Sequence, residues 1–426
     1  MNNYILKGDI CYSLNKDSIF TMENGYAVCE DGICKGVFDE IPQEYSDFPV
    51  IDYTSKLIIP GLIDLHVHAA QYAFRGLGMD MELLEWLNTR TFVEEQKYKD
   101  LEYADKAYEI FVKDMVKSPT TRACIFATIH QEATNLLMEK IEESGLVAYV
   151  GKVNMDRNSP DYLCESSAKV SVETTREWLT ACRDTYENVK PILTPRFIPT
   201  CSDELMMGLG DLQKEFGIPM QSHLSENMGE IEWVQELRPD TSFYGEAYHK
   251  AGMFGDACPT IMAHCVHSEE AEMDMMEKQG VFIAHCPDSN ANLSSGVAPI
   301  RTYLDRNMKV GLGSDVAGGC TISMFHVMAE TIRCSKLRWR MLDQNMTPLK
   351  VEEVFYLATK GGGEFFGKVG SFETGYEFDA VVLDDSDILS PQSLSVRERL
   401  ERLIYLAEGK HVIAKYVNGS KVYETE

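Results

Sequence analysis

The sequence has few basic residues, no paired cysteine motif and no long apolar run. Forty Lys and Arg stand against 67 Asp and Glu, for a net charge of −27, and such a surface repels phosphate backbones and anionic membranes. None of the 12 cysteines forms a Cys-x-x-Cys pair, which argues against zinc fingers and disulfide frameworks and fits a reducing compartment. No run approaches the roughly 20 apolar residues that cross a bilayer, and no signal-peptide pattern opens the chain. We therefore expect a cytoplasmic protein with neither nucleic-acid nor membrane partners.

The chain is long enough for a sizeable core. Its 426 residues are about two to three times the usual domain length, so one large domain and a smaller one are expected. Both ends carry short β-like pieces separated by turn residues, and Asn418-Gly419 is a strong hairpin signal. We expect residues 1–60 and 373–426 to form one composite β-sandwich domain around a different middle.

The middle alternates short apolar runs with amphipathic helical stretches, which is typical of βα repeats. The runs span residues 62–68, 122–129, 146–153, 192–198, 218–224, 260–266, 281–286 and 309–315. Eight such strands predict an α/β fold with a (β/α)8 barrel over residues 61–372. A doubly wound open sheet is the alternative, but it usually has fewer strands, and no Gly-x-Gly-x-x-Gly follows the first run here.

Polar residues gather where these runs end, which is where barrels carry their active sites. His66 and His68 end the first run, and residues i and i+2 of a strand share a face. Later runs end in Arg196, Phe197, His223, His264, His285 and Asp315. Imidazoles and a carboxylate suit zinc or iron(II) with an open position for water. The expected ligands are His66, His68, His223 and Asp315.

Each residue also has a structural interpretation. His285 is expected to be a structural residue or to support a metal ligand, and Asp315 taken alone could cap a helix. The remaining histidines lie outside the pattern and are expected to be ordinary: His130, His249, His267, His326 and His411. The combination of strand ends, and no single residue, therefore predicts the metal site.

These residues also carry a family resemblance. Pro60-Gly61-Leu62-Ile63-Asp64 running into His66-Val67-His68, with His223, His264 and Asp315 on later strands, resembles the amidohydrolase superfamily. Within it, the chain is similar to members that deaminate guanine, most specifically in the segments Arg196-Phe197-Ile198-Pro199-Thr200-Cys201 and His223-Leu224-Ser225-Glu226. The resemblance implies a metal-binding barrel joined to a β-sandwich built from both termini.

The resemblance also implies a single metal ion. Binuclear members carry a carboxylated lysine at the end of strand four, where this chain has Arg196. Lys152 lies on strand three and is expected to be structural. Leu65 and Ser314 depart from the common Thr at their positions, and neither is expected to touch metal or substrate.

The roles that the resemblance implies are those of a hydrolytic deaminase. One Zn²⁺ per subunit (Fe²⁺ is possible) would activate a water for attack on the amino-bearing carbon of guanine, giving xanthine and ammonia. Asp315 would take a proton from that water, Glu226 would protonate a ring nitrogen, and His264 would direct the water without binding the metal.

The same resemblance assigns recognition of the purine. Gln71 and Arg196 would hold the carbonyl edge of guanine, Phe197 would face the ring, and the substrate would also touch Glu226, His223 and Asp315. Trp86 is read first as a core aromatic, although it could wall the site. The expected partners are this small molecule and a second copy of the chain in a homodimer.

Two alternatives stay open. Another deaminase or hydrolase of the superfamily, acting on cytosine, an adenosine derivative or a chlorinated triazine, would share the metal set and differ around Gln71, Arg196 and Phe197. A catalytically inactive relative that serves in binding or assembly would have lost ligands, and every expected ligand is present here. Deaminases with a Pro-Cys-x-x-Cys motif are excluded, because the motif does not occur.

Overall fold

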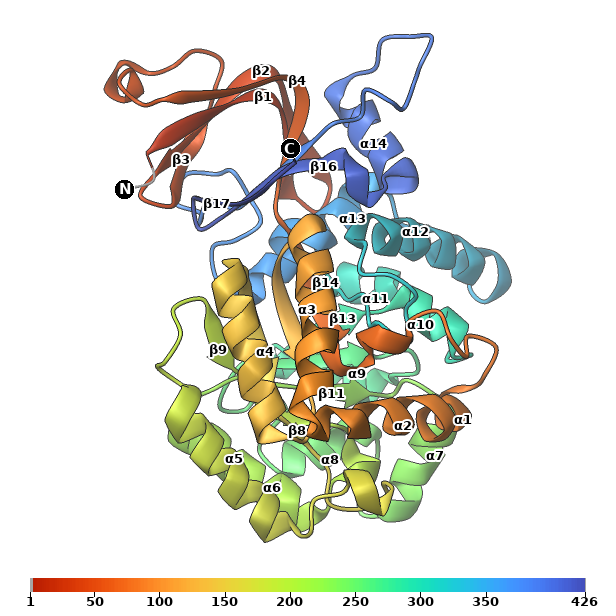
Figure 1. Ribbon diagram of the computed structural model, residues 1–426. Coiled ribbons are helices and arrows are strands. Elements are labelled where there is room, and N and C mark those ends of the chain that lie inside the picture. The colour runs from red at the N-terminus through yellow and green to blue at the C-terminus, as the bar shows by residue number, and fades with distance from the viewer. Residues whose placement is uncertain (1–2, 426) are drawn as a thin grey trace.

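The computed structural model describes residues 3–425 of the chain. A barrel surrounded by helices forms one part, and a sheet that contains both ends of the chain lies against it (Figure 1). Residues 1, 2 and 426 of the expected composite domain lie outside the described residues. The domain limits at 60/61 and 372/373 stay predictions.

The terminal sheet joins the two ends of the chain in one ladder of seven strands within the described residues, in the order β17-β16-β15-β4-β1-β2-β3. Strand β15 links the halves by pairing antiparallel with β4. The strands are β1 (Tyr4–Asn15), β2 (Ser18–Glu30), β3 (Ile33–Phe38), β4 (Val50–Pro60), β15 (Ala380–Leu383), β16 (Val412–Val417) and β17 (Ser420–Glu424). The expected assembly of a β-rich part from both termini is confirmed.

The predicted hairpin lies between β16 and β17, which pair antiparallel. Asn418 and Gly419 have φ angles of 48° and 73°, the left-handed values that a two-residue type I′ turn requires at both positions. Asn and Gly tolerate this conformation best among the natural residues. The turn is therefore set by local chemistry.

Seven of the eight predicted runs coincide with barrel strands, and one of these is split in two. The fourth strand was misplaced: it lies at Val189–Pro191, before the predicted run 192–198, which contains only a two-residue strand. The barrel strands are β5 (Leu62–His68), β6 (Thr120–Phe126), β7 (Val147–Gly151), β8 (Val153–Asn154), β9 (Val189–Pro191), β10 (Thr194–Pro195), β11 (Met220–Leu224), β12 (Thr260–His264), β13 (Phe282–His285) and β14 (Lys309–Leu312). Two parallel sheets, β5-β6-β7-β9 and β11-β12-β13-β14, form its two halves. A bridge between Leu193 and Met220 joins them on one side, and Asp315 N donates to His66 O at 2.8 Å on the other. The barrel is closed, so the open-sheet alternative is wrong.

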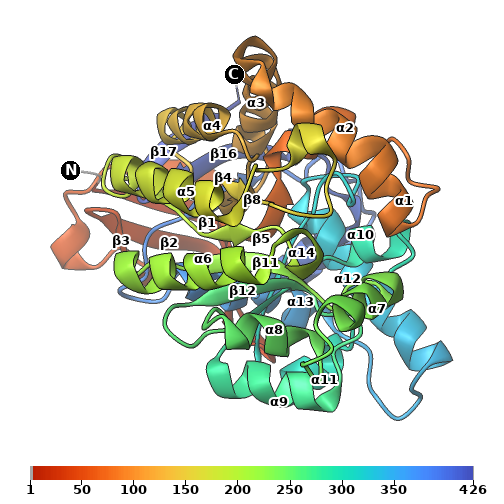
Figure 2. The same ribbon diagram turned by 90° about the horizontal axis from the view of Figure 1, so that it is seen from below.

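Helices surround these strands in the end-on view (Figure 2). They are α1 (Leu83–Trp86), α2 (Phe92–Glu95), α3 (Leu101–Lys117), α4 (Gln131–Ser144), α5 (Ala168–Cys182), α6 (Asp203–Phe216), α7 (Met228–Leu237), α8 (Tyr244–Lys250), α9 (Glu270–Gln279), α10 (Pro287–Asn292), α11 (Ile300–Asp305), α12 (Met324–Met341), α13 (Val351–Tyr356) and α14 (Val396–Leu406). Local signals fix their ends: the Ser202 side chain accepts from Leu205 N at the start of α6, and Gly217 ends it with φ 63°.

Strand β5 changes the face that it presents to the barrel interior. Ile63 and Leu65 pack in an inner cluster with side chains from β6, β12 and β13, yet His66 and His68 also point inward, to the same side as His223. Strict alternation cannot place both pairs inside. The β5–β6 register is irregular between Asp64 and Val67, and such a bulge shifts the alternation by one residue.

Two buried cations hold the barrel to the terminal sheet, and we call this region the seam (Arg122 and Lys415 with their partners). Arg122 donates to both carboxylate oxygens of Asp379 at 2.7 and 3.1 Å, to Glu377 at 2.7 Å and to Asn418 at 2.6 Å. Lys415 Nζ donates to three backbone carbonyls of residues 115–120 at 2.8–3.0 Å. The groups that bond these two side chains are thus all groups of the protein itself.

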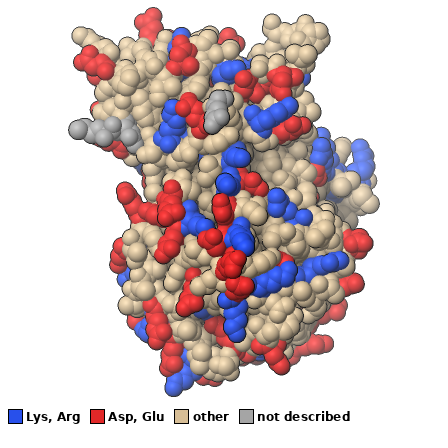
Figure 3. Space-filling model, in the orientation of Figure 1, with Lys and Arg blue, Asp and Glu red and all other residues tan. Residues whose placement is uncertain are grey.

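Acidic and basic side chains intermingle on the face shown in Figure 3, and no basic patch gathers there. Within residues 3–425, no helix is both long enough and apolar enough to cross a membrane.

Candidate active site

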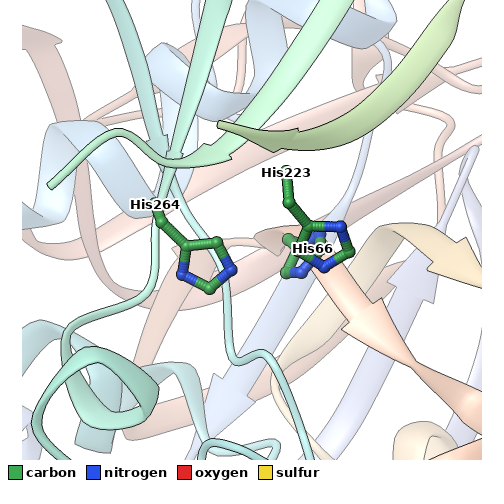
Figure 4. A group of neighbouring side chains, drawn as sticks. All are labelled: His66, His223 and His264. Carbon is green, nitrogen blue, oxygen red and sulfur yellow. The ribbon is translucent and has the colours of Figure 1, made fainter. Parts of the chain in front are cut away.

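Four predicted ligands converge at the carboxyl end of the barrel. His66 Nε2 lies 3.3 Å from His68 Nε2 and 3.1 Å from Asp315 Oδ1. His68 Nε2 is also 3.3 Å from His223 Nε2 and 3.4 Å from Asp315 Oδ1. Figure 4 shows how His66, His223 and His264 lie together, projecting from β5, β11 and β12. The ligands that we predicted from the strand ends therefore lie close together in the structure.

The donor set fits a zinc-sized cation. Burial lowers the pKa of His68 and of His223 well below the ordinary value, so both rings are neutral and offer a lone pair. Ligands at 2.0–2.1 Å around a tetrahedral zinc stand about 3.3 Å apart. His68 lies 3.3–3.4 Å from the other three side chains, and His66 lies 3.1 Å from Asp315. A cation at their centre would satisfy lone pairs that otherwise face one another.

The backbone and neighbouring side chains fix the orientation of these ligands. His223 Nδ1 donates to Arg196 O at 2.6 Å, which leaves Nε2 as the acceptor. The buried Asp64 carboxylate accepts from His66 N at 3.2 Å and from Ser314 N at 3.0 Å, so it ties the strand that carries the histidines to the loop that carries Asp315. Ser314 thus touches a carboxylate that supports the ligands, away from the cluster itself.

The rim of the barrel stores backbone strain at the candidate site. His264 and Asp315 have φ angles of 73° and 47°, and Ser225, beside Glu226, has 47°. Left-handed φ at a non-glycine residue costs on the order of 1–3 kcal/mol and persists where surrounding structure imposes it, most often at functional sites. The strained positions are one candidate ligand, Asp315, and two residues at or beside candidate proton-handling groups, His264 and Ser225.

Two carboxylates at the site differ in their affinity for protons: Asp315, which belongs to the cluster, and Glu226, which lies beside it. Burial alone would raise the pKa of Asp315, but the histidines around it hold that pKa well below its usual range. Burial and the Asp315 charge raise the pKa of Glu226 to about 8, although Ser295 Oγ donates to it at 3.0 Å. His264 Nε2 lies 3.4 Å from Glu226 and 3.7 Å from Asp315, while its Nδ1 is 2.8 Å from Asn290 Oδ1. One carboxylate is suited to stay ionised and the other to exchange a proton near neutral pH.

A small cavity opens over the cluster. Its apolar wall consists of Leu83, Trp86, Leu87, Phe197 and Leu293. Its polar lining consists of His68, Gln71, Arg196, His223, Glu226, Glu230, His264 and Asp315. Trp86 is buried as expected for a core aromatic and also forms part of this wall. All the predicted substrate contacts therefore face one space.

The structure adds Glu95, which the sequence did not indicate. Its carboxylate accepts from Arg196 Nη1 at 2.7 Å and from Gln71 Nε2 at 3.0 Å, and Phe92 lies under the guanidinium at 5.1 Å. No sequence motif identifies Glu95. It lies in helix α2, and only the tertiary packing of that helix brings it to the mouth of the barrel. Glu230 was also missed: burial and Glu226 raise its pKa to about 7, and it accepts from the backbone N of Glu226 at 3.1 Å. Asn227 and Glu230 form a capping box at the start of α7, and that Asn-x-x-Glu spacing is a signal that sequence reasoning could have used.

Two other expectations concern residues beyond the cluster. Lys152 is buried and paired with Glu165 at 2.7 Å, which confirms the structural interpretation. His285 is buried at the end of β13, and burial lowers its pKa to about 3. His285 does not belong to the described cavity lining, and its supporting role stays a prediction.

Comparisons with known proteins agree with this geometry. The model of the amidohydrolase family matches residues 57–422. A guanine deaminase of Dictyostelium discoideum is 38% identical over 98% of this chain and 98% of its own length, and that of Escherichia coli is 36% identical over 88% and 85%. A crystal structure of guanine deaminase from C. acetobutylicum, with guanine bound in its active site, superposes with a TM-score of 0.96 at 46% identity, covering 99% of this chain and 100% of that one.

Proposed function

The chain belongs to the amidohydrolase family, and on that premise we propose that it is a guanine deaminase that hydrolyses guanine to xanthine and ammonia. One observation carries the proposal: the cavity above the His66, His68, His223 and Asp315 cluster is lined by a buried arginine, a proton-exchanging carboxyl and an aromatic ring. These are the groups needed to hold a planar purine with a carbonyl edge and to move protons at it.

The cluster would hold one Zn²⁺ through His66, His68, His223 and Asp315. A bound Zn²⁺ would lower the pKa of a coordinated water from about 15.7 toward about 7. Arg196 occupies the position at which binuclear relatives carry a bridging lysine, and its guanidinium is committed to Glu95 at 2.7 Å. This supports a count of one metal ion.

Three residues would handle the protons. Asp315, with its lowered pKa, accepts a proton from the attacking water. Glu226, protonated near neutral pH because its pKa is about 8, donates to the ring nitrogen beside the amino-bearing carbon. The proton taken from water then passes to the amino nitrogen, which leaves as ammonia, and the remaining hydroxyl proton of the adduct returns to Glu226 as the carbonyl of xanthine forms. His264, held by Asn290 at 2.8 Å, hydrogen-bonds the water and fixes its direction.

Arg196, Gln71 and Phe197 would select guanine. The carbonyl oxygen of guanine accepts hydrogen bonds, whereas adenine presents an amino donor at that edge. The N–H groups of Arg196 that do not bond Glu95 would face a donor of adenine and be left without an acceptor, and such mismatches are worth about 10⁴–10⁵ in selectivity. Phe197 is buried against Trp233 at 6.2 Å between ring centroids, which keeps it in place beside the purine plane.

The direct test is an ultraviolet assay of the purified, zinc-loaded protein on guanine, adenine and cytosine. We expect xanthine to form from guanine and little or no change in the other two bases. Turnover of adenine derivatives or cytosine without turnover of guanine would favour another deaminase of the family. No turnover by a zinc-replete protein would favour a binding role. The homodimer, the cytoplasmic location and a place in purine breakdown stay predictions.

A further inference from the structure

A second group of metal-ligating side chains lies outside the cavity. Asp288 at the start of α10, Cys320 in the loop after β14, and His326 in the first turn of α12 have ligand atoms that all lie within 4.8 Å of one another. None of the three belongs to the described residues that line the active-site cavity. The chemistry of the proposed deamination uses none of them.

The geometry of this group is partly fixed by the backbone. Asp288 Oδ2 accepts from Cys320 N at 2.7 Å, which holds the loop against α10 and leaves Oδ1 facing His326 Nε2 at 3.6 Å. His326 Nε2 is buried and has no hydrogen-bond partner among the described residues. Cys320 is exposed and is the most accessible of the twelve cysteines, since the other eleven are buried or half-buried. The group therefore combines an ionic oxygen, a ring nitrogen directed at it and a thiol open to solvent.

We propose that Asp288, Cys320 and His326 form a second metal site, which binds a borderline-soft divalent cation of the Zn²⁺ type with water as the fourth ligand. Thiolate, imidazole and carboxylate together match the preferences of Zn²⁺ and Co²⁺, and a lone thiolate disfavours Mg²⁺ and Ca²⁺. His326 Nε2, whose contact with Asp288 Oδ1 is 3.6 Å, gains a ligand bond, and the cation offsets the charges of the carboxylate and the thiolate. The bound ion would join α10, α12 and the loop that leads from Asp315.

The sharpest test uses Co²⁺ as the probe on the zinc-loaded protein. The four ligands proposed for the first site are nitrogen and oxygen atoms, although the buried Cys286 thiol lies within 4.8 Å of His66 and Asp315. A thiolate bound to Co²⁺ gives a charge-transfer absorption in the near ultraviolet, and loss of the band in Cys320→Ser would assign it to the second site. We expect one further equivalent of metal in equilibrium dialysis, together with this band. Cys320→Ser should lose both while keeping its first zinc. The matched control is Cys164→Ser, at a half-buried cysteine outside the group, and it should keep both.

Alkylation provides an independent measure of the same site. Iodoacetamide should label Cys320 in the zinc-loaded protein, and added Zn²⁺ should slow labelling by about tenfold once its concentration is about ten times the dissociation constant. His326→Gln keeps the thiol but should lose the protection. Uptake of no second equivalent by the wild type would overturn the proposal. So would a cobalt band that survives in Cys320→Ser, or zinc protection that survives in His326→Gln.

Discussion

Arg122 and Arg196 are equally buried, each 3% exposed, yet they are bonded very differently. Arg122, at the seam, makes four hydrogen bonds of 2.6–3.1 Å to two carboxylates and an amide. Arg196, at the rim of the barrel, donates to a single carboxylate oxygen, that of Glu95, and lies over the Phe92 ring. A guanidinium has five N–H donors. Arg122 uses its Nε and Nη2 groups on acceptors of the protein, whereas Arg196 uses only Nη1, on Glu95, and its guanidinium also lines the cavity.

The difference separates two uses of a buried charge. At the seam the partners come from the chain, and the cost of desolvation is offset at the moment of folding. At the rim some of the partners must come from a ligand, so the fold holds donors and proton-exchanging groups ready for it. Substitutions at the rim should therefore change catalysis more than stability, and those at the seam should do the reverse.

The largest effect is expected from Glu226→Gln at the rim. Loss of a general acid lowers kcat by about 10²–10⁴-fold, because the amide cannot donate the proton that the ring nitrogen needs. Xanthine formation gives kcat, and metal analysis checks that zinc is retained. A zinc-replete variant with a rate near that of the wild type would remove Glu226 from the proton path.

Next in size is Arg122→Met at the seam. The change leaves Asp379 buried without its cation, which costs about 3–5 kcal/mol of unfolding free energy. Urea denaturation measures the loss, and kcat per zinc-containing subunit should stay near the wild-type value because Arg122 is remote from the cavity. A variant with the wild-type unfolding free energy but a lowered kcat would contradict the expectation that the seam contributes to stability and the rim to catalysis.

A smaller effect is expected from Glu95→Gln, which weakens the hold on Arg196. A hydrogen bond between charged groups contributes about 1.5–3 kcal/mol, so kcat/KM for guanine should fall by roughly 10–100-fold and discrimination against adenine should narrow. In an Arg196→Met background the same change should have much less effect, because the two residues act as a unit. Additive losses in this double-mutant cycle would contradict a positioning role for Glu95.

The smallest effect concerns pH and Glu230. Its pKa is raised from 4.5 to about 7, so its contribution to stability is present below the unfolded value and is lost as pH rises through the folded value. A glutamine at this position cannot ionise, so Glu230→Gln should remove this pH-dependent loss of stability. The fall in Tm between about pH 5 and about pH 8 should become smaller by a few degrees. Glu232→Gln, at an exposed position on the same helix, is the control and should leave the fall unchanged.

Features that depend on residue spacing could be predicted from the sequence. Seven of the eight apolar runs became barrel strands, and the residues at their ends met because parallel strands of a barrel bring their carboxyl ends to one rim. The Asn418-Gly419 turn followed from local conformational preference. In both cases the signal lies within a few neighbouring residues or in a regular repeat.

Features that depend on an irregularity or on a distant contact could not be predicted in this way. The bulge between Asp64 and Val67 has no marker in the sequence. Strict alternation would have directed the side chains of His66 and His68 to the face of the strand opposite to that of Leu65, away from the barrel interior. Glu95 contacts Arg196, 101 residues later in the chain, through a helix whose position over the barrel mouth is set by packing. Asp288 lies near Cys320 and His326 through a contact that spans 32 residues, and none of the three residues ends a strand.

The seam also sets the order in which the protein can be completed as it is made. Arg122 leaves the ribosome early, and its partners Asp379 and Asn418 follow 257 and 296 residues later. At about 5–20 residues per second, the guanidinium waits roughly 15–60 s for them. Until then Arg122 lacks the side chains beside which it is buried, so the seam can form only after the strands that follow the barrel in the sequence have been made.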